Sequence, residues 1–187
     1  MIESEARLIA GLRDLFHTSF ENGVEVGIGD DGAVIAASDK KLVATVDMAV
    51  EEIHFKREWS TPLQIGAKLT TANLADVFAM GATPKYLLVA AAITEVNNSQ
   101  IVTDLANGIR SVADKFKVSV IGGDLSKAEK MSISITALGE LTGKAITRDG
   151  AKVGDLVYLS ALPGLSAAGL AILTRGLNRP KYVVEAH

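Results

Sequence analysis

The chain has 187 residues, of which 48% are hydrophobic, and its net charge is only −3. A chain of this length buries a substantial core, and its 19 scattered basic residues form no Lys/Arg stripe of the kind that binds nucleic acid or anionic membranes. It contains no cysteine, which excludes disulfides, thiolate zinc sites and cysteine nucleophiles and fits a cytoplasmic protein.

The N-terminal part predicts a helix, two strands and a second helix. Apolar residues recur at helical spacing over 3–20, among acids and arginines that are not typical of a signal peptide, and the glycine-rich segment 23–32 ends this helix. AVIAA at 33–37 and KLVATVD at 41–47 predict short strands. A proline opens the long helix predicted over 62–80. No apolar run approaches the ~18 residues of a membrane helix, so we expect a soluble protein.

The middle of the chain continues the alternation of strands and helices. Strands are predicted at 86–93, 118–123 and 131–141, and a helix is predicted at 99–116. This order indicates an α/β (α+β) fold, with a mixed sheet and flanking helices.

A boundary between two domains is expected at 142–155, a segment that lacks apolar periodicity and holds three glycines. The predicted domains are therefore 1–142 and 143–187. In the second domain, DLVYLSA at 155–161 predicts a strand and SAAGLAILTR at 166–175 predicts a helix. About 40 residues are too few for a second independent core, so we expect an incomplete α/β domain.

The strand at 41–47 is expected to present oxygen ligands. Its period of two places Val43, Thr45 and Asp47 on one face and the intervening residues on the other. A hydroxyl and a carboxylate therefore share a surface, which we expect to lie at the C-terminal end of the strand.

The long helix carries a further acid. Steps of four, three and four residues from Ile65 place Asp76 on the predicted buried stripe, with Asn73 one turn before it. An unpaired buried carboxylate is costly, so Asp76 should face a polar site or form a structural ion pair. The candidate partners for such a pair are Lys68, Lys85 and Arg110.

Glycines accompany three more acids. Asp30 and Asp31 lie in GIGDDGA, and Asp124 follows Gly122 and Gly123, which allow the backbone to approach a ligand closely. The candidate oxygen ligands are Asp30, Asp31, Thr45, Asp47, Asn73, Asp76 and Asp124. Such ligands suit hard cations, and Mg²⁺ in particular is held by a few carboxylates together with substrate phosphates. Glycine amides at 122 and 123 can also face phosphate oxygens.

Each of these features also has a structural interpretation. GDDG is often a surface turn, the glycine pair can form another turn, and Asp47 or Asp124 can begin a loop or cap a helix. His54, beside an aromatic residue, is more typical of packing, and Arg148 in the hinge is more typical of a solvated charge, although a guanidinium suits phosphate. The sequence has no Walker-type glycine loop and no kinase HRD or DFG motif.

Six segments in order resemble the thiamine-monophosphate kinase family of the PurM-like (aminoimidazole ribonucleotide synthetase-like) superfamily. They are GIGDDGA, ATVDMAVEEIHF, ANLADVFAMGATP, IGGD, ITRDGAKVGD and SAAGLA. The resemblance extends over 3–187 and implies a PurM-like N-terminal domain. It also implies Mg²⁺- and ATP-dependent phosphorylation of thiamine monophosphate to thiamine diphosphate by direct in-line transfer. It further implies a homodimer whose N-terminal sheets join into a barrel.

The resemblance assigns roles to individual positions. The Mg²⁺ ligands of the family match Asp30, Thr45, Asp47, Asp76 and Asp124. Val46 replaces a hydroxyl residue, so a metal bond there would use the backbone carbonyl. Gly123 and Asp124 match a nucleotide contact, and Arg148 matches the ATP-binding arginine. His54 matches a histidine that contacts the substrate.

Two positions depart from the family pattern, since Leu165 replaces a common aspartate and Ala106 replaces an aromatic residue found in some relatives. Family members also continue into a longer C-terminal domain that supplies further metal and thiamine contacts. We therefore expect a partial chain with little activity by itself. The alternatives are another PurM-like ATP-dependent enzyme, such as aminoimidazole ribonucleotide synthetase, or a non-catalytic fragment for nucleotide binding and dimerisation. Selenophosphate synthetase normally carries a reactive N-terminal Cys or selenocysteine, which this chain lacks.

Overall fold

The computed structural model describes residues 5–17, 22–94, 99–159 and 163–186. The helix predicted over 3–20 therefore extends at both ends beyond the described residues. The chain divides into two compact units, Met1–Thr147 and Arg148–His187, and each unit is described by itself.

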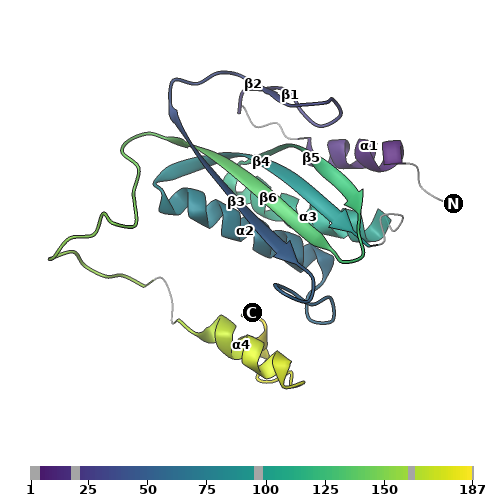
Figure 1. The fold of residues 1–187 in the computed structure, drawn as a ribbon, viewed down its shortest axis with the longest axis vertical. Helices are drawn as coiled ribbons and strands as arrows, with labels where there is room; N and C mark the ends of the chain where they lie inside the picture. Colours follow the sequence, from purple (N-terminus) through teal and green to yellow (C-terminus); the bar gives the residue numbers. More distant parts are fainter. Residues whose placement is uncertain (1–4, 18–21, 95–98, 160–162, 187) are drawn as a thin grey trace. The chain divides into compact units, whose positions relative to one another are not determined.

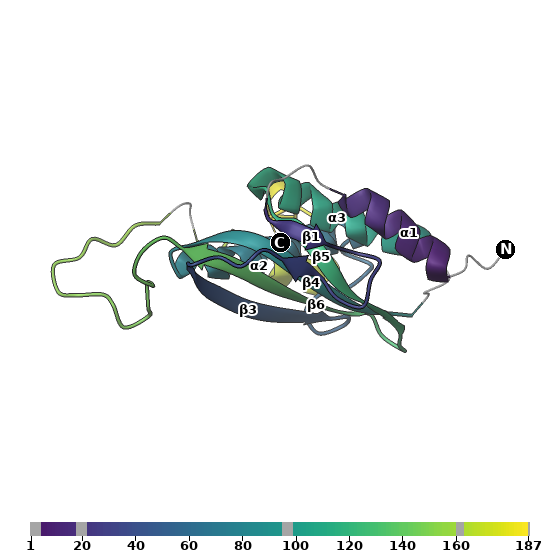
Figure 2. The same ribbon diagram turned by 90° about the horizontal axis from the view of Figure 1, so that it is seen from above.

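A four-stranded mixed sheet is the centre of the first unit (Figure 1). Its strands are β3 (Lys41–Val50), β4 (Ala82–Ile93), β5 (Ser119–Lys127) and β6 (Ser132–Leu141). The order is β3-β6-β4-β5, with β6 antiparallel to both of its neighbours and β5 parallel to β4. β3 and β5 are consequently the two edge strands, as the view in Figure 2 shows.

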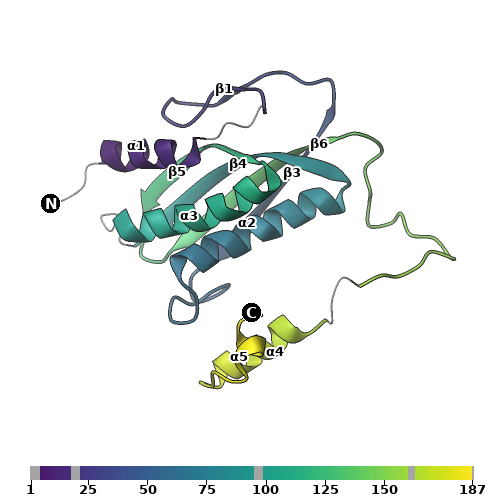
Figure 3. The same ribbon diagram turned by 180° about the vertical axis from the view of Figure 1, so that it is seen from behind.

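Two long helices, α2 (Pro62–Ala79) and α3 (Ser99–Phe116), cover one face of the sheet (Figure 3). α2 begins in a capping box, in which Thr61 Oγ1 accepts the N–H of Gln64 and Gln64 Oε1 accepts the N–H of Thr61. It ends at Ala79, and Gly81, just beyond the C-cap Met80, has a φ of 78° that is accessible mainly to glycine. Both helix predictions are confirmed. None of the described helices is long and apolar enough to cross a bilayer.

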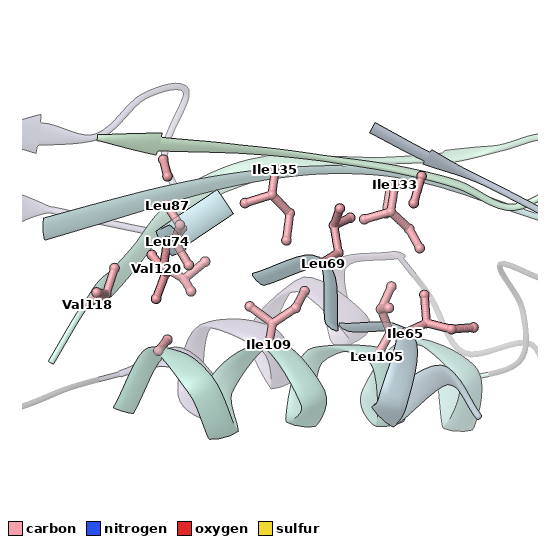
Figure 4. Packing of buried hydrophobic residues seen from close by; sticks show 14 of the residues in the cluster. Ile65, Leu69, Leu74, Leu87, Leu105, Ile109, Val118, Val120, Ile133 and Ile135 are labelled. Carbon is pink, nitrogen blue, oxygen red and sulfur yellow. The ribbon is translucent and has the colours of Figure 1, made fainter. Parts of the chain in front are cut away.

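The main core lies between this sheet and these helices (Figure 4). Ile133 and Ile135 on β6 are fully buried and point toward Leu105 and Ile109 of α3, in agreement with the period of two along the strand. Leu74 of α2 is also buried, with 1% of its surface accessible. Burial of these branched side chains fixes which face of each strand meets the helices.

The opposite face of the sheet is not covered by a helix in the described part of the first unit. β3 exposes Leu42, Val46 and Met48 there, each with 59–60% of its surface accessible. Leu88 of β4 is 37% exposed. Contiguous apolar exposure of this kind is typical of an interaction surface.

The first unit begins with α1 (Glu5–Phe16), which packs against α3. A small antiparallel pair follows, formed by β1 (Val24–Val26) and β2 (Val34–Ile35). The predicted strand at 33–37 is thus confirmed in shortened form, whereas β1 was not predicted. Between β1 and β2 lies the glycine-rich segment that carries two of the predicted acids.

The second unit contains α4 (Leu165–Thr174) and the short α5 (Lys181–Val184). The helix predicted at 166–175 is confirmed. The strand predicted at 155–161 is wrong for 155–159, which has no regular structure, and its last two residues lie outside the described residues. A strand needs a neighbour to pair with its backbone, and no strand is described in this unit.

Candidate functional site

One group of predicted ligands lies where β3 contacts α2. Thr45 Oγ1 donates a hydrogen bond to Asp76 Oδ2 at 3.2 Å, and the Asp47 N–H donates to Asn73 Oδ1 at 3.1 Å. Thr45 and Asp47 share the face of β3 that meets the helices, as predicted, because their partners on β6 are fully buried. Two carboxylates, those of Asp47 and Asp76, therefore gather at the β3 edge of the sheet.

The prediction that Asp76 lies on the buried stripe of α2 is wrong. Asp76 is exposed, whereas Asn73 is fully buried. The buried residues of α2 are Ile65, Gly66, Leu69, Thr70, Asn73, Leu74 and Val77. Asp76 lies beside this stripe, so its charge stays in contact with water and needs no compensating ion pair. Arg110, one candidate partner, pairs instead with Asp114 at 3.1 Å.

Asn73 connects α2 to β3. Its Nδ2 donates to the Leu69 carbonyl at 3.0 Å, while its Oδ1 accepts the Asp47 N–H. Both polar atoms of this buried amide are thus engaged within the protein, which favours a structural role over the predicted role of neutral metal ligand. Asn73 fixes the backbone from which the Asp47 carboxylate projects.

Asp47 and Asp124 lie inside strands, not at strand ends as predicted. β3 continues to Val50 and β5 continues to Lys127, because β6 and β4 keep pairing with them beyond the two acids. Their side chains are consequently held by sheet geometry and not by flexible loops.

A second group of acids lines a pocket of about 680 Å³ at the β5 edge. Segment 27–33 lines part of this pocket, and residues 120–125 of β5 line another part. Asp30, Asp31 and Asp124, which are far apart in the sequence, therefore lie around one cavity. The GDDG motif is thus part of a pocket wall.

The rest of the pocket is mainly apolar. Its wall is formed by side chains of α1 and α3, namely Ile9, Leu12, Phe16, Val102, Leu105, Ala106 and Ile109. Ala106 is almost fully buried, so the small residue at this position leaves room within the cavity. The pocket combines an apolar end with an acidic and glycine-rich rim.

The glycine-rich rim has a defined local geometry. Gly29 has φ of 120°, which side-chain-bearing residues rarely adopt. Asp30 Oδ1 accepts the N–H of Asp31 at 3.0 Å, an interaction that stabilises the turn. A Cβ built on Gly29 would lie 3.5 Å from Arg13 Cδ, so the Arg13 side chain of α1 contacts this loop.

Gly123 is required by the packing of the sheet itself. A Cβ there would lie 1.9 Å from the Val89 carbonyl oxygen, next to the register shift between Leu87 and Leu88. The close approach is therefore between two strands, whereas the sequence predicted an approach to a ligand. Gly123 nevertheless lines the pocket beside Asp124, whose Oδ2 accepts the Ser126 hydroxyl at 2.9 Å.

The two groups of acids are separated within one chain. Sheet pairing runs from Asp47 through Ile135 and Val89 to Gly123, which is three strand spacings, or about 14 Å. A single Mg²⁺ binds its ligands at about 2 Å, so Asp47 and Asp124 of one chain cannot share an ion. No cluster of three or more metal-binding His, Cys, Asp or Glu side chains occurs among the described residues.

The remaining predicted site residues occupy three different places. His54 lies in the turn after β3, where its Nδ1 accepts the Val50 N–H at 3.0 Å. Val46 projects from the uncovered face of the sheet. Arg148 is exposed and begins the second unit.

A partly exposed ion pair lies on the uncovered side of the sheet. Lys40 Nζ contacts Glu140 Oε2 at 3.0 Å, and this hydrogen bond holds the pKa of Glu140 below its usual value. Burial, with a smaller contribution from the Glu140 charge, raises the pKa of Tyr86. Tyr86 therefore stays protonated and can donate a hydrogen bond.

Sequence reasoning missed Arg13, which contacts the glycine-rich loop, and Asn22, which directly precedes this loop. Asn22 Nδ2 donates to the Lys117 carbonyl at 3.0 Å and to Ser119 Oγ at 2.9 Å. Asn22 stands directly before Gly23, and this Asn-Gly turn signal was the available indication. For Arg13 the only signal was a basic residue in the last turn of α1.

Comparison with known proteins gives consistent matches. Residues 29–141 match the family described as AIR synthase related protein, N-terminal domain. A thiamine-monophosphate kinase of Bacillus subtilis (strain 168) is 36% identical over 180 residues, which cover 92% of this chain and 55% of that relative. The chain spans about half the length of the curated relatives it matches.

Solved structures of similar fold also include thiamine-monophosphate kinases. Thiamine-monophosphate kinase from Stenotrophomonas maltophilia K279a matches with a TM-score of 0.80 and 31% identity, over 94% of this chain and 54% of that one. AaThiL complexed with AMPPCP and TMP matches with a TM-score of 0.70 and 32% identity, over 95% of this chain and 54% of that one.

Proposed function

This chain belongs to the family of AIR synthase related proteins, whose N-terminal domain it contains, and we propose that it is part of a thiamine-monophosphate kinase. The reaction would transfer the γ-phosphoryl group of ATP to the phosphate of thiamine monophosphate, giving thiamine diphosphate and ADP. The observation that carries this proposal is the single pocket that joins the glycine-rich loop to Asp124. The relatives described above are named for the same reaction. We expect the enzyme to work in the cytoplasm.

The pocket suits a nucleotide in both size and chemistry. Its apolar end, between α1 and α3, would receive the adenine ring, because removal of the ring's apolar surface from water is favourable. The rim at 27–33 and Gly123 would lie along the phosphates, where backbone amides bind anionic oxygens. From the family resemblance, we propose that Arg148 binds ATP through its guanidinium, a group that suits phosphate. The solved complex of AaThiL with AMPPCP and TMP supports the choice of reactants.

The donor set fits Mg²⁺, because it consists of carboxylate oxygens with a hydroxyl and no soft ligand. We assign the metal to Asp30, Thr45, Asp47, Asp76 and Asp124, with the Val46 carbonyl as a further donor. When bound, Mg²⁺ neutralises phosphate charge and aligns the two phosphate groups. The β3 edge is suitable for a carbonyl ligand because only one side of this strand is paired within the sheet.

The two groups of acids become one site if two chains associate. We propose a homodimer in which β3 of one subunit lies near β5 of the other. Asp47 and Asp76 would then lie along the same seam between subunits as Asp30 and Asp124 of the partner subunit. The exposed apolar face formed by Leu42, Val46, Met48 and Leu88 supports this arrangement, because pairing two such faces would close a barrel and bury both.

The reaction requires the protein mainly to position the two reactants. The attacking atom is a phosphate oxygen of thiamine monophosphate, so no side chain has to activate a hydroxyl. The new P–O bond forms as the bond from the γ-phosphorus to the bridging oxygen of ADP breaks, and no covalent enzyme intermediate is required. The chain therefore orients two anionic reactants, with His54 as the proposed contact to the thiamine substrate.

A turnover assay with the intact protein tests the proposal. Asp47→Asn should lower turnover by about two orders of magnitude or more while leaving the fold intact, since it removes one metal ligand and relieves carboxylate repulsion. Asp39→Asn, at an exposed turn, is the matched control and should retain activity. Full activity of Asp47→Asn would refute the metal assignment. Turnover of formylglycinamidine ribonucleotide in place of thiamine monophosphate would refute the proposed substrate.

A further inference from the structure

Asn22 is tied to three elements of the first unit. Its Nδ2 donates to the Lys117 carbonyl, just after α3, and to Ser119 Oγ, at the start of β5. Its own carbonyl accepts the hydroxyl of Tyr86 from β4. The amide nitrogen, and not the amide oxygen, faces the Lys117 carbonyl, because a carbonyl can only accept a hydrogen bond.

Asn22 also stands at the base of a closed loop. The Ala36 N–H donates to the Gly23 carbonyl at 2.7 Å, so segment 23–36 leaves the body of the unit and returns at one point. Gly23 adopts φ of 71° to make this turn. The pocket-lining residues 27–33, including Asp30, lie within this closed loop.

The contact that Asn22 makes and the pocket lie along the same strand, β5. Ser119, which Asn22 contacts, begins β5, and Asp124 lies five residues further on, at a distance of about 17 Å along the strand. The loop therefore reaches the pocket from a base fixed to the same strand that carries Asp124. A displacement of the base would change the separation of Asp30 and Asp124.

We propose that Asn22 and Tyr86 form a latch that positions the loop 23–36 over the pocket. They are positioning residues, because their polar atoms bind the protein and not a ligand. The latch deepens the proposed function: it would set affinity for the nucleotide phosphates, while leaving the phosphate acceptor and the transfer step unaffected. Neither residue was a candidate from the sequence.

Hydrogen exchange of the protein tests the latch without reference to catalysis. Tyr86→Phe keeps the buried ring and removes only the hydroxyl, so the fold should persist. Amides of 23–36 should exchange about tenfold faster in this variant, a factor that corresponds to the loss of one hydrogen bond. Amides of α3 and β6 should not change. Tyr182→Phe, at an exposed tyrosine of the second unit, is the matched control.

Steady-state kinetics provide the second readout. In Tyr86→Phe and Asn22→Ala, the KM for ATP should rise about tenfold, while kcat and the KM for thiamine monophosphate stay within about twofold. A merely structural role would reduce the active fraction without changing the KM for ATP. Unchanged exchange in 23–36, faster exchange throughout the unit, or an unchanged KM for ATP would each overturn the latch. If the wild-type protein used no ATP, the proposed function would fail, and the exchange experiment would still decide the latch.

Discussion

At the level of single residues, the helical pattern placed Asp76 on the buried face of α2, whereas Asn73 is the polar residue buried there. The steps of four, three and four residues correctly placed Ile65 and Leu69 on the buried face, but the last two positions, Ala72 and Asp76, are exposed. A pattern of residue types cannot resolve a rotation of one position around a helix, whereas burial of the Asn73 amide depends on the strand packed against it. Thr45 and Asp47, by contrast, share a face as the strand period predicted.

The hydrogen bonds of Asn73 lead to a prediction about the free energy of unfolding. Asn73→Ala removes the acceptor for the Asp47 N–H and the donor to the Leu69 carbonyl, so it should lower the free energy of unfolding by about 2–3 kcal/mol. Urea denaturation measures this difference. Asn178→Ala, at an exposed asparagine, should stay within about 0.5 kcal/mol of wild type. Equal effects of the two substitutions would argue against a structural role for the Asn73 hydrogen bonds between α2 and β3.

The lowered pKa of Glu140 leads to a prediction about how stability depends on pH. Its folded-state pKa lies below the ordinary value of 4.5, because Lys40 donates a hydrogen bond to the carboxylate and Lys85 adds a favourable charge. Its contribution to stability is therefore fully present above about pH 4.5 and is lost as the pH falls through the lower folded-state pKa. The stability difference between wild type and Glu140→Gln should shrink on acidification in urea melts. Glu25→Gln, at an exposed site, should show no such trend.

At the level of elements, α2 and α3 pack closely because each carries a glycine at the contact. A Cβ on Gly66 would lie 2.3 Å from the Leu105 carbonyl oxygen, and a Cβ on Gly108 would lie 2.0 Å from that of Leu63. Backbones can approach this closely only where no side chain intervenes. This contact holds α2, and with it Asp76, against the β3 edge.

Two glycine substitutions should therefore have opposite effects. Gly108→Ala should lower the free energy of unfolding by about 3 kcal/mol, because the backbone of Leu63 cannot yield to the new methyl group. Gly11→Ala in α1, where a Cβ meets nothing within 4 Å, should raise it by about 0.5–1 kcal/mol through helix propensity. Thermal and chemical denaturation of both variants check this contrast, and destabilisation by both would contradict it.

The elements themselves were predictable where local signals agreed. The capping residues of α2 and the periodicity of α3 define helices that depend little on tertiary context. β1 was missed because three residues carry too short a pattern to recognise. The strand predicted at 155–161 was wrong over 155–159 because an apolar run becomes a strand only beside another strand.

At the level of the whole molecule, the order of strands was beyond sequence reasoning. The resemblance to PurM-like proteins is confirmed by the family match over 29–141 and by the solved relatives. Local patterns could not show that β3 and β5 occupy opposite edges, because strand order is decided by long-range pairing. Consequently the predicted single cluster of acids appears in one chain as two groups.

The central claim is that these two groups form one catalytic site across a homodimer. It is tested most directly by mixed dimers of Asp47→Asn and Asp124→Asn, purified through a different affinity tag on each variant. Each mixed dimer would contain one intact and one doubly substituted site, so it should recover about half of wild-type turnover although both parent variants are nearly inactive. Mixed dimers as inactive as their parents would contradict the shared site.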